Sequence, residues 1–118
     1  MVSFALKLEP RGEDAAAILT VRGDLDMYTV PEFQERLAEL AESEHDGLVV
    51  DLAATTFVDT CACRALLRAA RRLRDQGARL VVVNQDPEVR RVFDVMGLDE
   101  FLTVVATRAH AARALTTA

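Results

Sequence analysis

The chain has 118 residues and a formal net charge of −5, with 51% hydrophobic and 28% charged residues. This length and balance predict one folded domain with a buried core and exclude a largely disordered chain. Basic residues are not in excess, which argues against direct binding to nucleic acid or to an anionic membrane. No apolar run approaches the roughly 18 residues that a membrane span needs, so we expect no membrane insertion.

The N-terminus and the cysteines indicate the compartment. No basic segment followed by a continuous apolar run opens the sequence, so we predict no signal peptide and a cytoplasmic protein. Cys61 and Cys63 stand one residue apart and cannot cross-link distant segments. A structural disulfide framework is therefore excluded.

The first third of the chain predicts a hairpin followed by a helix. Alternating apolar residues predict a half-buried strand with Val2, Phe4, Leu6 and Leu8 on one face. Residues 10–14 read as a turn, and residues 18–21 form a second strand that pairs with the first. The following helix has an apolar face made of Val30, Phe33, Leu37 and Leu40.

The remaining sequence alternates strands with helices. Buried strands are predicted at 48–50 and 79–83, and a last strand at 101–105. The second helix follows Asp59 and Thr60 and ends at Gly77. The third helix begins at Asp86-Pro87 and has a buried face of Val89, Val92, Phe93 and Met96. A fourth helix runs from Thr107.

This order, β-β-α-β-α-β-α-β-α, predicts an α/β fold. Strands that alternate with helices of this length are joined by right-handed crossovers and build a mostly parallel sheet. We therefore expect a mixed sheet with the N-terminal hairpin at one side and four helices.

The junction between the strand at 48–50 and the second helix is the best candidate site. A helix N-terminus presents unpaired N–H groups and partial positive charge, which favour a phosphate or a thiolate. Asp59 and Thr60 equally suit an ordinary helix cap. Cys61 falls in the first turn, where thiol pKa values are lowered, and is a reactive-thiol candidate. Cys63 falls on the apolar face, as a buried small hydrophobe would.

No residue set predicts catalysis, a metal site or a cofactor. The chain has no glycine-rich phosphate loop, zinc-binding His-Glu motif or nucleophile elbow, so we predict that it is not an enzyme. Asp24 and Asp26 could bind a cation, but two carboxylates without further ligands favour a solvated turn. His45 and His110 are predicted at the surface. The second helix has either a solvated basic face or a patch for an acidic partner, made of Arg64, Arg68, Arg71, Arg72 and Arg74.

A series of motifs resembles the STAS domain of bacterial anti-sigma factor antagonists. They are Gly23-Asp24-Leu25-Asp26, Val49-Val50-Asp51-Leu52, Phe57-Val58-Asp59-Thr60 and Pro87-Glu88-Val89, in the family's order and spacing. The resemblance covers nearly all of the chain and implies a single STAS domain over residues 1–118. It also implies a protein that binds an anti-sigma factor, often a serine kinase, and so releases a sigma factor. The resemblance further implies that phosphorylation at the start of the second helix reverses that binding.

The sequence departs from the family at the usual phosphoacceptor. The antagonist motif is Asp-Ser-Ser-Gly with the second serine as acceptor, and here that position is Cys61, followed by Ala62. Thr60 matches the acceptor of related stressosome proteins and is our phosphoacceptor candidate. The resemblance implies a partner-binding surface that comprises Asp26, Asp59, Thr60, Cys61, Ala62 and Arg64.

Other functions stay open at this level. The chain could be an accessory STAS subunit, either of a stressosome, whose proteins Thr60 matches, or of a lipid-transport ABC ATPase, whose STAS subunits the run from Asp59 to Ala62 resembles. A thiol sensor that uses Cys61 is a further reading. Independently of these, the edge of the N-terminal strand could pair two copies into a homodimer.

Overall fold

A computed structural model describes residues 4–9, 17–42 and 47–116. The elements follow the predicted order, with one short 3-10 helix added. They are β1 Ala5–Glu9, β2 Ala17–Arg22, α1 Val30–Glu42, β3 Gly47–Asp51, α2 Thr60–Asp75, β4 Arg79–Val83, α3 Pro87–Val95, η1 Leu98–Glu100, β5 Thr103–Val105 and α4 Arg108–Thr116. Val2, the turn at 10–14 and His45 lie outside the described residues.

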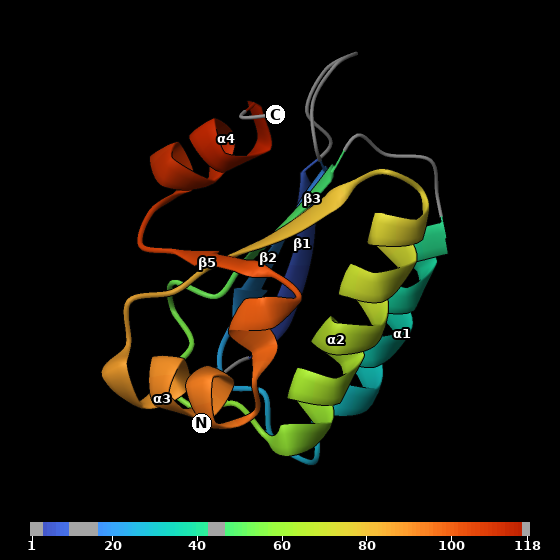
Figure 1. Cartoon of the computed structure of the whole chain (residues 1–118). Coiled ribbons are helices and arrows are strands. Elements are labelled where there is room, and N and C mark those ends of the chain that lie inside the picture. Colours follow the sequence, from blue (N-terminus) through green and yellow to red (C-terminus); the bar gives the residue numbers. More distant parts are fainter. Residues whose placement is uncertain (1–3, 10–16, 43–46, 117–118) are drawn as a thin grey trace.

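The five strands form one sheet in the order β1-β2-β3-β4-β5. β1 pairs antiparallel with β2 at the edge, and the other three pairings are parallel. The predicted mixed sheet with a hairpin at one side is therefore confirmed. Parallel crossovers place α1 and α2 side by side along one side of the sheet, with α4 on the other (Figure 1).

The two faces of the sheet bury side chains in two separate clusters. Alternation along β3 sends Leu48 and Val50 into the larger cluster, beneath the helices α1, α2 and α3. Phe33 and Phe93, both fully buried, belong to the same cluster. Val49 points to the opposite face, where α4 covers a smaller cluster of Ile18, Val49, Val81, Val83 and Ala111.

Arg108, the first residue of α4, fixes that helix to the sheet. Its Nε donates to Asp51 Oδ2 at 2.5 Å, Nη1 to Glu9 Oε2 at 2.9 Å and Nη2 to Thr20 Oγ1 at 2.7 Å. Asp51 is buried, so this guanidinium supplies the counter-charge that a carboxylate inside a protein needs. The hydrogen bond from Arg108 lowers the pKa of Glu9, and the bond to Asp51 raises the pKa of Arg108.

Three details differ from the sequence-based predictions. Met96 caps the end of α3 and is 37% exposed instead of buried, because the helix ends one residue earlier. Leu8 is 38% exposed, since β1 is an edge strand. Phe101 lies outside β5, because its N–H group donates to the carbonyl of Leu98 in the last turn of the 3-10 helix.

Candidate functional site

The candidate site lies where three parallel strands end. Residues 23–29 follow β2, residues 52–59 follow β3 and residues 84–86 follow β4. The carboxyl ends of parallel strands meet at one edge of a sheet, which is where α/β proteins commonly bind their ligands. These loops and the start of α2 gather at the same end of the molecule (Figure 1).

The first two loops are joined by backbone pairing. Leu25 N–H donates to the Phe57 carbonyl at 2.9 Å, and Asp59 N–H donates to the Leu25 carbonyl at 2.7 Å. Asp24 Oδ1 also accepts from the N–H groups of Thr56 and Phe57, at 2.9 and 3.2 Å. Asp24 thus holds the second loop in place, where the sequence suggested a solvated turn.

Two buried polar side chains tie the third loop to the others. Asn84 Nδ2 donates to the carbonyls of Leu52 and Thr55 at 2.7 and 3.2 Å, and Asn84 Oδ1 accepts from Asp86 N–H at 2.7 Å. Thr55 Oγ1 donates to the Gly23 carbonyl at 2.9 Å. Asn84 and Thr55 are fully buried and hydrogen-bonded, so they fix the relative positions of the three loops.

Asp59 is the N-cap of α2, as predicted. Its Oδ1 accepts from Cys61 N–H at 2.8 Å, and the helix begins at Thr60. Thr60, Cys61 and Arg64 are exposed and Asp59 is half-buried, so these predicted site residues share one accessible region.

Ala62 and Cys63 lie on the other side of this helix. Ala62, predicted to bind a partner, is fully buried in the core, and we therefore leave it out of the candidate surface. Cys63 is fully buried, as predicted, and this burial raises its thiol pKa to about 11. Because the thiolate is the reactive form, Cys63 is inert at neutral pH. Cys61 is the exposed thiol of the pair.

Asp26 shapes the turn that leads into α1. Its Oδ1 accepts from the N–H groups of Tyr28 and Thr29 at 2.9 and 3.1 Å. Thr29 Oγ1 donates to the Asp24 carbonyl at 2.7 Å and accepts from Asp26 N–H at 2.9 Å. The turn presents Met27 and Tyr28 to solvent, with exposed fractions of 71% and 83%.

Large apolar side chains are exposed on the elements that gather at the end of the molecule where α2 starts (Figure 1). Met27, Tyr28 and Phe57 are exposed on the first two loops, and Val95 and Met96 at the end of α3. We call these five residues the apolar rim. A groove of about 310 Å³ runs between α2 and α3 and includes Thr60, Arg91, Val95 and Met96 in its lining. The end of α3 therefore lies next to Thr60.

Sequence patterns did not identify the apolar rim. Met27, Tyr28 and Phe57 lie between the predicted strands and helices and belong to no periodic apolar face. The only sequence signal for them is that they are large apolar residues in connecting segments. The periodicity of the third helix placed Met96 in the core. The neighbourhood of Thr60 and α3 depends on a tertiary contact that no local pattern encodes.

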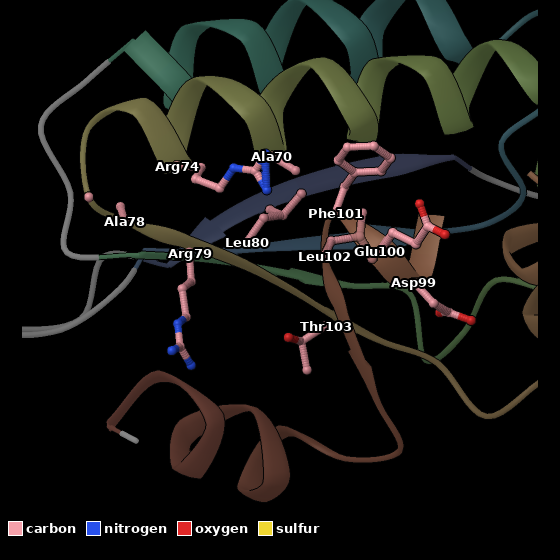
Figure 2. A pocket seen from close by; sticks show the side chains of 11 residues that line it. Ala70, Arg74, Ala78, Arg79, Leu80, Asp99, Glu100, Phe101, Leu102 and Thr103 are labelled. Carbon is pink, nitrogen blue, oxygen red and sulfur yellow. The ribbon is translucent and has the colours of Figure 1, made fainter. Parts of the chain in front are cut away.

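A second cavity, of about 390 Å³, lies beside the C-terminal half of α2 (Figure 2). Arg74, Arg79, Asp99 and Glu100 line it with Phe101. Arg71 and Arg74 hold their guanidinium carbons 5.0 and 5.9 Å from the centre of the Phe101 ring, within the range of cation–π contacts. These two arginines therefore have an intramolecular role and are remote from Thr60, at the opposite end of the helix.

The described part of the chain shows neither a metal-binding cluster nor a membrane-spanning helix. No group of three or more histidine, cysteine, aspartate or glutamate side chains there is placed to hold a metal ion. His110 is exposed on α4. Within the same residues, no helix combines the length and the apolar character that a membrane crossing requires.

Comparison with known proteins gives consistent matches. A relative named anti-sigma-F factor antagonist RsfA, from Mycobacterium tuberculosis, is 32% identical over 108 residues, which cover 90% of this chain and 84% of that protein. The solved structure of an anti-sigma factor antagonist from Mycobacterium paratuberculosis superposes with a TM-score of 0.86 at 24% identity, over 98% of this chain and 96% of that one. Unphosphorylated SpoIIAA gives a TM-score of 0.76 at 19% identity, over 97% and 99% of the two chains.

The two superpositions show a shared fold. The family model described as the STAS domain matches residues 7–111, from within β1 to within α4. That match contains most of the hairpin, the parallel strands and the loops that build the candidate site. The chain belongs to the STAS domain family.

Proposed function

We propose that this chain is an anti-sigma factor antagonist, which binds an anti-sigma factor and thereby releases a sigma factor. The observation that carries the proposal is the apolar rim around the exposed start of α2. Exposed apolar side chains gathered in one region mark interaction sites, whereas single ones are ordinary. The name of the Mycobacterium tuberculosis relative supports the class of partner.

The construction of the loops suits recognition of a folded protein. Asp24, Thr55 and Asn84 hold three loops together through hydrogen bonds to backbone groups. A surface that is ordered before binding loses less conformational entropy in the complex, which favours affinity. Tyr28 and Phe57 then supply aromatic contact area, and Asp26, Asp59 and Arg64 supply polar contacts around it.

The proposed switch is a phosphoryl group on Thr60. A kinase would transfer the γ-phosphoryl group of ATP to the Thr60 hydroxyl, with loss of its proton and release of ADP. The product adds about 1.5 to 2 negative charges beside Asp59. The start of α2 partly offsets this charge in the free protein, but a packed interface would desolvate it at higher cost. Thr60 is exposed and lines the groove, which supports its accessibility to a kinase.

Sigma release from purified components tests the function. Affinity capture from the host supplies the anti-sigma factor, and this chain is then titrated into its complex with the sigma factor. We expect release by the native chain and a loss of about tenfold or more in potency for Tyr28→Ala, as for an aromatic interface anchor. Leu8→Ala, at an exposed apolar residue of the edge strand, is the control and should release normally.

The same capture separates the alternatives. Recovery of an ABC ATPase, or of a particle of stressosome size, without an anti-sigma factor would contradict the antagonist role and favour an accessory subunit. Release of sigma factor that is lost on oxidation and preserved in Cys61→Ser would instead support the thiol sensor.

Phosphate mapping by mass spectrometry, after incubation with the captured anti-sigma factor and ATP, tests the switch. We expect label on Thr60 and none in Thr60→Val. Cys61→Ser places a hydroxyl at the family's usual acceptor position. This variant therefore shows whether the kinase phosphorylates position 61 when a hydroxyl is present there. Label elsewhere in the native chain, or none, contradicts the assignment to Thr60.

A further inference from the structure

The groove between α2 and α3 carries an inference about the partner. Its lining joins the first residue of α2, Thr60, to one side of α3. That side consists of Glu88, Arg91, Val92, Val95 and Met96. The volume of about 310 Å³ is large enough for one or two amino-acid side chains.

The most exposed apolar residues of this lining are not the ones that pack α3 against the core. Val89 and Phe93 are buried in the large core, and Val92 is half-buried against it. Val95 is 78% exposed and Met96 37%. One side of α3 therefore packs into the core. A second, more exposed apolar strip on this helix faces Thr60 across the groove.

The charged part of the lining consists of Arg91 and Glu88. Among the described residues, the Arg91 guanidinium makes no hydrogen bond or ion pair, and Glu88 on the same side of α3 lies beyond ion-pair distance from it. A guanidinium pairs best with a carboxylate, through two parallel hydrogen bonds. Within the described part of the chain, the groove thus combines an apolar strip with an unpaired guanidinium and the carboxylate of Glu88.

We propose that this groove is the second half of the partner-binding surface, where an apolar side chain of the anti-sigma factor enters between Thr60 and Val95 while a neighbouring carboxylate of that protein pairs with Arg91. The inference rests on the proposed function and names the chemistry of its partner. Two observations support this occupant: Val95 and Met96 of the apolar rim line the groove, and the Arg91 guanidinium has no ion-pair partner among the described residues.

The position of Thr60 in the lining links the groove to the proposed switch. A phosphoryl group there fills space that the apolar side chain needs, and it competes with the partner's carboxylate for Arg91. Arg64, one helical turn along α2, and Asp59 at the cap are the other charged side chains close in sequence to that position. Phosphorylation therefore acts by occupation of the groove as well as by repulsion.

Two neighbouring arginines on α3 provide a matched test. Arg91 lines the groove, and Arg90 is also exposed but does not belong to the groove lining. With the purified anti-sigma factor, calorimetric titration should give a dissociation constant raised about tenfold or more by Arg91→Glu and changed less than about threefold by Arg90→Glu. Circular dichroism melting of the free variants checks that both remain folded.

Photocrosslinking locates the contact without a loss of charge. A benzophenone side chain at position 96 should give an adduct with the purified anti-sigma factor, whereas the same group at position 8 should not. Peptide sequencing of the adduct should find an apolar residue with an aspartate or glutamate close to it. An adduct whose neighbourhood has no carboxylate overturns the pairing with Arg91.

The outcomes separate the two proposals. If Tyr28→Ala loses binding while Arg91→Glu binds normally and position 96 gives no adduct, the groove inference is wrong and the proposed function stands. If neither Tyr28→Ala nor Arg91→Glu alters binding to a confirmed partner, both the rim and the groove are wrong. Equal losses for Arg90→Glu and Arg91→Glu indicate general electrostatic attraction and also overturn the groove inference.

Discussion

The two faces of the sheet are built by different means. Under α1, α2 and α3, a large cluster that includes Phe33, Leu66 and Phe93 excludes water from a continuous core. Under α4, the cluster is small, and the helix contributes alanines and one leucine. That side relies on Arg108, whose guanidinium reaches three strands. The comparison teaches that one face is held by apolar packing and the other by a polar clamp.

The largest expected effect is on the three-helix face. Phe33→Ala removes a fully buried aromatic ring from the large cluster and should lower the free energy of unfolding by about 3–5 kcal/mol. Urea unfolding followed by circular dichroism measures it. A loss below about 1 kcal/mol would mean that this face is not close-packed around the ring.

Breaking the polar clamp should cost less. Arg108→Ala leaves buried Asp51 without its counter-charge, and we expect a loss of about 1–3 kcal/mol, because the clamp is partly open to solvent. Hydrogen exchange should rise first in α4. Arg79→Ala is the control, since Arg79 donates one exposed hydrogen bond to the Ala114 carbonyl in the same helix. Equal effects of the two variants would contradict a special role for Arg108.

Two adjacent valines compare the faces directly. Val50 points into the large cluster and Val49 toward α4, and both are almost fully buried. Val50→Ala should destabilise by about 1 kcal/mol more than Val49→Ala, because a short helix can settle over the lost methyl groups more easily than three packed helices can. Urea midpoints of the two variants test this. The reverse order would show that α4 is the more rigidly packed side.

The smallest effect concerns acid. Because Arg108 lowers the pKa of Glu9 below its ordinary value of 4.5, the ion pair stabilises the folded state above that pH. The contribution is lost as pH falls through the folded pKa, when the carboxylate is protonated. Glu9→Gln should therefore lower the thermal midpoint at neutral pH and have little effect in acid. Glu32→Gln on the exposed side of α1 is the control. If the thermal midpoint of Glu9→Gln differed from that of the native chain by the same amount at neutral and at acid pH, the ion pair with Arg108 would be contradicted.

The periodicity of the sequence predicted most of the fold. Alternation in the first strand, the continuous apolar runs at 48–50 and 79–83 and the helical spacing from Val30 to Leu40 reflect burial on one or two faces, which local sequence records directly. Asp59 and Asp86 marked two helix starts because capping depends on the next two or three residues. Element ends were predicted less well, as Phe101 and Met96 illustrate.

The candidate site could be predicted only in part. Asp59, Thr60 and Cys61 were identified because a strand-to-helix junction is visible in sequence, and the family motifs placed Asp26 beside them. Ala62 was assigned to the partner-binding surface because the family's motif was transferred to this chain residue by residue. The packing of α2 instead places Ala62 in the core.

The α/β architecture, the hairpin at its edge and the capped start of α2 are predictable from the sequence, because each depends on short-range periodicity or capping. The hydrogen bonds by which Asp24, Thr55 and Asn84 hold three loops together depend on the folded arrangement, since their partners lie about 30 residues away in the chain. The same is true of the positions of Val95 and Arg91 beside Thr60. Which residues become neighbours in this way depends on how the helices pack on the sheet. A local sequence pattern carries no information about that packing.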